Sequence, residues 1–217
     1  MSGTKLGLTA DELLTTTRAV RKRIDFDRPV ERDIVMECVE IAQQAPTGSN
    51  NQGWRWVFVD DPDKKRAIAD HYRSNFYPYT GIDDPENTVL PDRADDQGAR
   101  ILGSALSMAK RLHEVPLMAI PLHVGRLEGA SSFQQASAWG SILPAVWSFL
   151  LALRERGIGS SWTTLHLPNE REVANLLGIP YDEYTQVGMF PIGYTLGTDF
   201  KVADRVSAEK FVHWNEW

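Results

Sequence analysis

The feature that most constrains the fold is a long stretch without charge in the second half of the chain. No Asp, Glu, Lys or Arg occurs from Gly129 to Leu153, and this is about the length that a helix needs to cross a bilayer. The stretch is nevertheless rich in serine and glutamine, and it contains Pro144. Such polarity favours a helix buried in protein over a helix that faces lipid. We therefore expect a soluble protein with one unusually buried helix and no association with a membrane.

The composition excludes other classes of protein. The 217 residues are 42% hydrophobic and 24% charged, as in a packed globular domain, but they are too few for a full α/β barrel. With 23 Lys and Arg against 29 Asp and Glu, the net charge of −6 is a poor electrostatic match for nucleic acid. The single cysteine, Cys38, excludes an internal disulfide and any multi-cysteine metal site. The polar N-terminus shows no secretory or transit signal, so we expect a cytoplasmic location.

The apolar periodicity predicts helices and strands in alternation, which is typical of an α+β or α/β fold. Helices are predicted from Ala10 to Arg23 after a capping Thr9, from Glu31, after Pro62, over 94–113, through the charge-free stretch, and from Pro168 to Gly178. Strands are predicted at 54–60, 115–125 and 185–197, with a short strand or loop at 157–167. The loop from Thr80 to Asp92 is interpreted as a lid over a site. Because no repeat or linker occurs, residues 1–217 are expected to form one domain.

Motifs for several kinds of catalysis are missing. The chain has no GxxxxGK[ST] loop, no HExxH and no GxSxG elbow, and in GIGSSW Trp162 stands where a dinucleotide fingerprint needs its third glycine. The histidines lack metal-ligand spacing, and His71, His113 and His213 are expected at the surface. Cys38 lies on the apolar stripe of its helix and is interpreted as a buried structural thiol. We therefore expect no catalytic side chain and no metal ligand, so an enzyme here would need a cofactor that brings its own chemistry.

Four other segments have patterns that suit ligand binding. On the predicted first helix, Arg18 and Lys22 stand one turn apart on the same face, which also suits the negative end of a helix dipole. APTGSNNQGW (45–54) lets the backbone approach a ligand closely, or forms a simple helix-to-strand turn. GSSWTTL (159–165) places small hydroxyl residues around one large aromatic ring. In the tail, Lys201 and Arg205 could hold a phosphate or lie on the surface.

Taken together and in order, these segments resemble the nitroreductase family of FMN flavoproteins. The segments that carry the resemblance are RAVRK (18–22), APTGSNNQGW (45–54), GIGSSWTTL (157–165), LLGIP (176–180), PIGYTLG (191–197) and KVADRV (201–206). Each motif alone is weak, but six in the same order over nearly the whole chain are specific.

The resemblance implies an α+β fold with a central, mixed but mostly antiparallel sheet flanked by helices, in an intertwined homodimer. Two FMN sites are then expected at the subunit interface. The charge-free helix, from about Ser132 to Arg156, is expected to form much of that interface. The C-terminal tail, about 198–217, is expected to pack on the partner subunit.

The resemblance also assigns residues to the flavin. The expected cofactor-binding residues are Arg18, Ala19, Val20, Lys22, Pro46, Thr47, Gly48, Asn50, Trp162, Thr163, Thr164, Leu165 and Arg205. The cations near the N-terminus contact the phosphate or the N1–C2=O edge of the ring, and Arg205 contacts the phosphate. The segment at 46–50 reaches the flavin held mainly by the other subunit, while the segment at 162–165 lies along the ring and offers a backbone N–H to N5. Val20 replaces a usual serine, and Gly53 replaces a usual proline.

The activity that the resemblance implies is a ping-pong transfer of two electrons from NAD(P)H, through FMN, to a small electron-poor acceptor such as a nitroaromatic or a quinone. Such a cycle needs no protein nucleophile, which accounts for the missing motifs. Two alternatives remain open: another chemistry on the same fold (a dehalogenase, a flavin-fragmenting enzyme or an azoline dehydrogenase) and a flavin-binding protein without turnover. Substrate choice is expected to depend on the loop at 80–92 and on nearby Phe76, Tyr77 and Tyr79.

Overall fold

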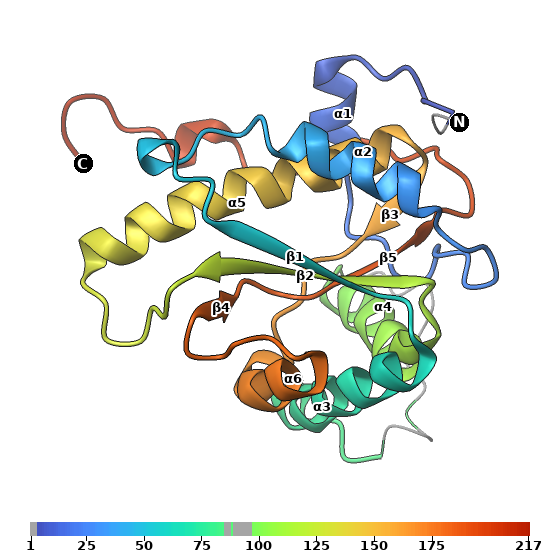
Figure 1. Ribbon diagram of the computed structural model, residues 1–217. Helices are drawn as coiled ribbons and strands as arrows, with labels where there is room; N and C mark the ends of the chain where they lie inside the picture. The colour runs from blue at the N-terminus through green and yellow to red at the C-terminus, as the bar shows by residue number, and fades with distance from the viewer. Residues whose placement is uncertain (1–3, 85–87, 89–96) are drawn as a thin grey trace.

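One central sheet separates two layers of helices. The computed structural model describes residues 4–84, 88 and 97–217 (Figure 1). The helices are α1 (Ala10–Thr16), α2 (Arg32–Ala42), α3 (Pro62–Thr80), α4 (Gln97–Arg111), α5 (Ser132–Glu155) and α6 (Glu170–Leu177). The strands are β1 (Trp54–Val59), β2 (Leu117–Val124), β3 (Ile158–Ser160), β4 (Tyr184–Gln186) and β5 (Phe190–Tyr194). Figure 1 shows α1, α2 and α5 on one side of the sheet and α3, α4 and α6 on the other.

The sheet confirms the predicted α+β class. Its strand order is β1-β2-β5-β3, with β4 also paired to β2, and these named strands pair antiparallel. Among the described residues, parallel pairing occurs in one isolated bridge, between Ala19 and Ser160. The strand predicted at 185–197 is in fact two strands, because Met189 exchanges backbone hydrogen bonds of 2.8 and 3.1 Å with Thr163 and so leaves β2 between β4 and β5.

The charge-free helix is buried along one face only. Ile142, Val146, Phe149 and Leu153 are at most 1% exposed and pack with α2 and the sheet in one hydrophobic core. The opposite face is open in the single chain, where Phe133 is 81% exposed. By length and apolarity α5 could cross a bilayer, but its buried face is that of a core helix. The prediction that this helix is buried is therefore right for one of its two faces.

The prediction that the first helix continues to Arg23 is wrong. The helix ends at Thr16, where the hydroxyls of three successive threonines donate to carbonyl oxygens four residues earlier, each at 2.6 Å. These side-chain hydrogen bonds destabilise a helix. Beyond Thr16 the backbone pairs with strand β3 instead, since the Val20 amide donates to Ser160 O at 2.8 Å. Arg18 and Lys22 are therefore not one helical turn apart.

Other expectations have mixed outcomes. Cys38 is fully buried, and burial raises the pKa of its thiol to about 11, which confirms a structural thiol. Of the histidines expected at the surface, His213 is exposed, but His71 and His113 are half-buried. The described residues contain no group of three or more His, Cys, Asp or Glu side chains that could hold a metal ion. Most of the loop at 80–92 lies outside the described residues.

Candidate functional site

A cavity of about 150 Å³ lies between the end of α1, strand β3 and the C-terminal half of α5. Four of the predicted site residues line it: Arg18, Ala19, Val20 and Trp162. The remaining lining residues are Thr17, Trp147, Leu150, Arg154, Ile158, Gly159, Ser160 and Ser161. The fold thus brings together the segments at 18–22 and 159–165, which lie far apart in the sequence.

Close packing of the backbone forms the floor of this cavity. Residues Ala19 and Val20 run alongside Ser160, and a Cβ atom placed at Gly159 would lie 2.7 Å from Val20 Cβ and 2.7 Å from a Thr195 methyl group. Gly159 therefore has to lack a side chain for these two segments to meet. Val20 is 3% exposed and packs in the core. Because its side chain is a hydrocarbon, it has no hydroxyl to offer a ligand.

Arg18 lines the cavity, and the charge of Arg205 in the tail acts on it. The Arg18 guanidinium donates to carbonyl oxygens of Thr15 at 2.9 Å, Thr17 at 2.6 Å and Lys201 at 2.5 Å. Burial, and next to it the positive charge of Arg205, lower the pKa of Arg18. Two cations this near to each other are a candidate site for a doubly charged phosphate, because arginine makes charge-assisted hydrogen bonds to phosphate oxygens.

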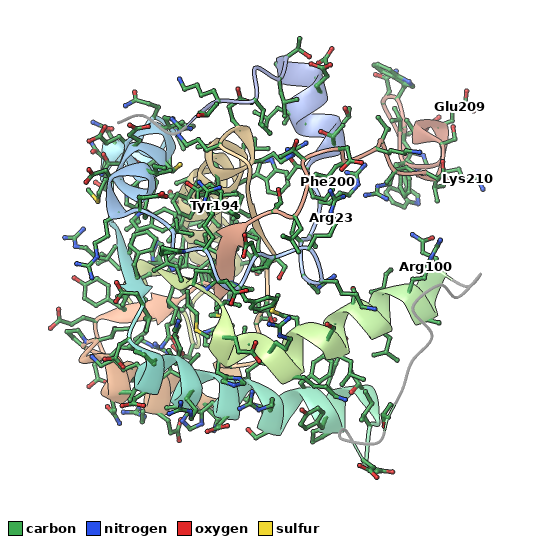
Figure 2. All side chains as sticks on the ribbon, turned by 90° about the vertical axis from the view of Figure 1, so that its right-hand side faces the viewer. Arg23, Arg100, Tyr194, Phe200, Glu209 and Lys210 are labelled. Atoms are coloured by element: carbon green, nitrogen blue, oxygen red, sulfur yellow. The ribbon has the colours of Figure 1, made fainter. Side chains whose placement is uncertain are left out.

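The start of the C-terminal tail is fastened to the body of the protein by further arginines. Arg23 donates to Leu196 O at 2.9 Å and pairs with Asp199 at 2.7 Å, while its guanidinium lies 4.3 Å from the centre of the Phe200 ring (Figure 2). Arg154 donates to Thr198 O at 3.1 Å. Beyond this anchor the tail turns large apolar side chains to solvent, namely Val202, Val206, Phe211, Val212, Trp214 and Trp217.

The segment at 162–165 alternates between the core and the surface. The backbone of Thr163 is bonded to Met189, its side chain hydrogen-bonds Tyr72, and Leu165 packs against the core beneath the sheet. Trp162 and Thr164 are exposed. Because the Thr163 amide already has a partner, Thr164 is the residue of this segment best placed to offer a backbone N–H to a ligand.

Trp162 is held by the strand behind it. Its ring meets Phe190 edge-on at 5.0 Å between centroids. A Cβ atom at Gly188 would lie 2.8 Å from the Trp162 indole nitrogen and 3.1 Å from Thr163 O. Gly188 is therefore needed for the close packing of this segment on the chain between β4 and β5.

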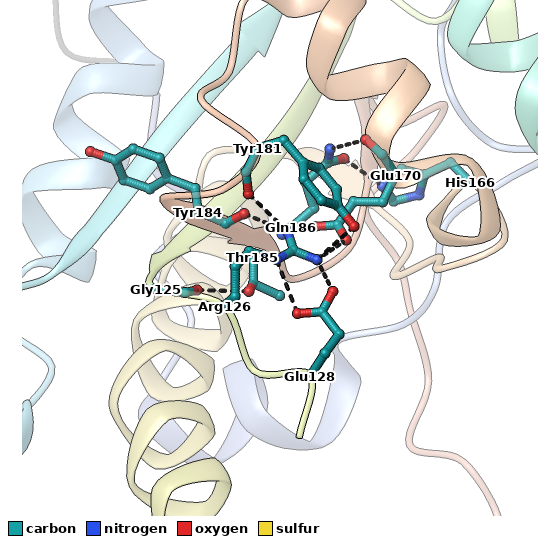
Figure 3. A network of polar contacts seen from close by, with 9 residues as sticks. All are labelled: Gly125, Arg126, Glu128, His166, Glu170, Tyr181, Tyr184, Thr185 and Gln186. Atoms are coloured by element: carbon teal, nitrogen blue, oxygen red, sulfur yellow. Dashed lines mark hydrogen bonds and ion pairs between the residues drawn. The ribbon is translucent and has the colours of Figure 1, made fainter. Parts of the chain in front are cut away.

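A polar network, buried at His166 and Gln186, supports the same segment from behind (Figure 3). Arg126 donates to both carboxylate oxygens of Glu170, at 2.9 and 2.8 Å, and the backbone amide of Gln186 donates to Glu170 Oε1 at 2.7 Å. The Gln186 side chain then meets His166 Nε2 at 3.2 Å. His166 is fully buried, and burial lowers its pKa to about 4. The sequence pattern held no signal for this network, since its members come from separate segments.

We expect the buried His166 to make the protein less stable in weak acid. Its folded-state pKa lies below the ordinary value of 6.5, so between pH 6.5 and about 4 the unfolded chain binds the extra proton and stability falls as pH falls. The full shift corresponds to about 3 kcal/mol of unfolding free energy. Urea unfolding from pH 7 to 4 should show a flatter profile for His166→Gln than for the exposed control His213→Gln. Equal pH slopes in the two variants would contradict this role.

A second, larger cavity of about 630 Å³ lies at the N-terminal half of α5. Thr47 and Gly48 line it, and the Gly48 amide donates to Ser141 Oγ on α5 at 3.1 Å. Pro46 and Asn50 are exposed beside it. Ser49, Asn50 and Gln52 have φ values of 52°, 55° and 49°, a left-handed conformation that costs free energy in non-glycine residues. Such strain is typical of loops that are shaped for binding.

The predicted site residues therefore fall into two groups on one chain. One group surrounds the cavity at the C-terminal half of α5, and the loop at 46–50 lies by the cavity at its N-terminal half. Arg205 and Lys22 line neither cavity. The charge of Arg205 nevertheless acts on Arg18, and Lys22 lies exposed in the turn after Val20.

Residues 15–194 match the family model described as "Nitroreductase family", and this match covers most of the chain. The chain belongs to the nitroreductase family. Within it, the chain is 27% identical over 187 residues to the iodotyrosine deiodinase of Thermotoga neapolitana, covering 83% of this chain and 86% of that protein. It is 25% identical over 171 residues to the 5,6-dimethylbenzimidazole synthase of Rhodospirillum rubrum, covering 76% of this chain and 73% of that one.

Solved structures support the same fold. The FMN-dependent nitroreductase NfnB from Mycobacterium smegmatis, solved in complex with NADPH, superposes with a TM-score of 0.66 at 18% identity, covering 95% of this chain and 98% of that one. At this identity the likeness concerns the fold alone. The names of these three similar proteins describe three different reactions, so the family assignment of this chain fixes the architecture and leaves the reaction open.

Proposed function

We propose that this chain is an FMN-dependent oxidoreductase that passes two electrons from NAD(P)H to a small electron-poor acceptor, such as a nitroaromatic or a quinone. The observation that carries the proposal is that Arg18 and Trp162 line one cavity, while the charge of Arg205 acts on Arg18. A cation for a phosphate thus lies beside an aromatic side chain for a planar ring.

The residues at this cavity fit FMN. Arg18, together with Arg205 of the tail, would bind the phosphate. Lys22, which lies in the turn after Val20 and outside the cavity, would reach toward the N1–C2=O edge of the ring, where a positive charge stabilises the reduced, anionic form. The Thr164 amide would orient the ring through N5. FMN, when bound, supplies the two-electron redox chemistry. The protein binds, orients and shields it, which agrees with the absence of a recognisable nucleophile in the sequence.

We further propose that the active form is a homodimer in the cytoplasm. The exposed face of α5 carries Phe133, Gly140, Pro144 and Trp147 and no charge, and an open apolar stripe of this kind is typical of a subunit interface. A two-fold axis near the middle of α5 would place the loop at 46–50 of one subunit over the cavity at Trp162 of the other. The apolar tail beyond Lys201 would then pack on the partner subunit.

A second candidate function is reductive dehalogenation of an aromatic substrate on the same fold. It is favoured by the 27% identity to the deiodinase, which extends over 83% of this chain. Both functions use the same FMN site and differ in the acceptor. The acceptor is expected to be selected by residues around the loop at 80–92, which the described residues cover only in part.

Anaerobic reduction tests the proposal. The purified protein is expected to be yellow, to bleach with NADPH or NADH, and to regain its colour on addition of a nitroarene or a benzoquinone. Reoxidation by a halogenated tyrosine with release of halide, and by neither of the other acceptors, would favour the dehalogenase. A protein that binds FMN but does not bleach with either nicotinamide would contradict the proposed electron donor, and one that binds no flavin would overturn the whole proposal.

A further inference from the structure

Arg154, in the last turn of α5, is a buried cation that lacks an ion pair within the described part of the chain. Its residue is 4% exposed, and its Nη2 donates to Thr198 O at 3.1 Å and to Thr16 Oγ1 at 3.4 Å. Its Nε and Nη1 are buried and have no hydrogen-bond partner among the described residues. The guanidinium also lies 4.9 Å from the centre of the Phe200 ring, whose face offsets part of the charge. Two buried nitrogens without an acceptor remain costly unless an anion lies nearby.

The carboxylate nearest in sequence does not fill this need. Glu155 raises the pKa of Arg154 against the larger, lowering effect of burial. Its carboxylate oxygens, however, accept the backbone amides of Gly7 at 2.7 Å and Leu8 at 3.2 Å. Arg154 therefore has the Phe200 ring but no carboxylate beside it among the described residues, so an anion from outside the chain can still gain from its charge.

The cavity beside Arg154 is the one lined by Arg18. A further buried polar atom without a partner among the described residues, Ser160 Oγ, belongs to another residue that lines it. Val20, at the position where the family resemblance leads us to expect a serine, brings only a hydrocarbon side chain. The cavity thus has two unsatisfied polar groups and lacks one expected hydroxyl.

We propose that Arg154 is a third cation of the phosphate site and that its charge strengthens FMN binding, in addition to its hydrogen bond to the tail. The inference rests on the proposed FMN site. Arg154 also holds Thr198, and thereby the tail that carries Arg205, while its charge lies in a buried environment where electrostatic attraction is weakly screened. The charge takes over part of the role that a hydroxyl at Val20 would have.

The test compares FMN with riboflavin, which has the same ring but no phosphate. Apo-protein is titrated with each flavin in the wild type, Arg154→Gln, Arg154→Lys, Arg205→Ala and the double variant Arg154→Gln/Arg205→Ala. Arg154→Gln keeps a hydrogen-bond donor and loses the charge, whereas Arg154→Lys keeps the charge. We expect Arg154→Gln to weaken FMN binding about fivefold or more, to leave riboflavin within about twofold, and to be rescued by lysine.

The double variant separates the charge from the hold on the tail. If the charge matters, Arg154→Gln weakens FMN binding in the Arg205→Ala background as well. An effect that disappears in this background would mean that Arg154 acts only by placing Arg205, and it would overturn the proposal. Equal losses for FMN and riboflavin, or no loss, would also overturn it. If the wild type binds neither flavin, the proposed function fails instead.

A second measurement does not depend on the stability of Arg154→Gln. In the wild-type protein the Nε–H resonance of Arg154 can be assigned by its loss in Arg154→Lys. It should shift on addition of FMN and stay within experimental error on addition of riboflavin. Equal shifts with both flavins would contradict a response to the phosphate.

Discussion

Gly140→Arg is expected to abolish the dimer and, with it, FMN binding. Gly140 lies on the exposed face of α5, and a Cβ atom there meets no other atom of the chain within 4 Å. Within one chain the change is harmless and even favours the helix by about 1 kcal/mol, because glycine is a poor helix former. In the proposed dimer it places two like charges in a desolvated apolar interface. We expect a monomer by analytical ultracentrifugation and an FMN affinity lowered by at least about 100-fold, since each site loses the partner's loop.

The matched control is Ser74→Arg. Ser74 is exposed on α3, on the other side of the sheet, so this variant adds the same charge to a helix that is not part of the proposed interface. It should remain dimeric and keep its flavin. A Gly140→Arg protein that is still a dimer would show that α5 does not form the interface. A monomer that retains full FMN affinity would show that each site is complete within one chain.

Arg205→Ala is expected to weaken FMN binding by about 10- to 100-fold, because a charge-assisted contact to the phosphate contributes roughly 1.5–3 kcal/mol. The structure brings the charge of Arg205 close enough to Arg18 to lower its pKa, so removing it takes away half of the arginine pair. Isothermal titration of apo-protein measures the change, and the loss should shrink at high salt, where the attraction is screened.

Lys210→Ala is the control for this prediction, since it removes a cation from an exposed part of the same tail. It should bind FMN like the wild type. Riboflavin affinity should be the same in both variants, because the ligand has no phosphate. If Arg205→Ala binds FMN as tightly as Lys210→Ala does, Arg205 is not part of the phosphate site.

Local patterns predicted most of the fold. The amphipathic stretch after Glu31, the β-branched run at 54–59 and the glycine at 178 each mark an element that the structure contains. The prediction that the first helix reaches Arg23 failed because of two effects that apolar periodicity does not report. The threonine hydroxyls bond to carbonyl oxygens of their own helix, and a strand distant in sequence accepts a hydrogen bond from the Val20 amide. No window of sequence around residue 20 contains that strand.

The sequence by itself determined the family and the order of its motifs, and it predicted one long helix without charge. Only the tertiary structure decided that one face of this helix is buried and the other open, and that Arg18, Arg154 and the anchored tail meet at one cavity. The physical reason is that periodicity reports which side chains avoid water, whereas a binding site is a set of contacts between segments distant in sequence. Arg154 is a buried cation and His166 has a lowered pKa because of such contacts. Burial and neighbouring groups, and not residue type alone, set the free-energy cost of charging a side chain.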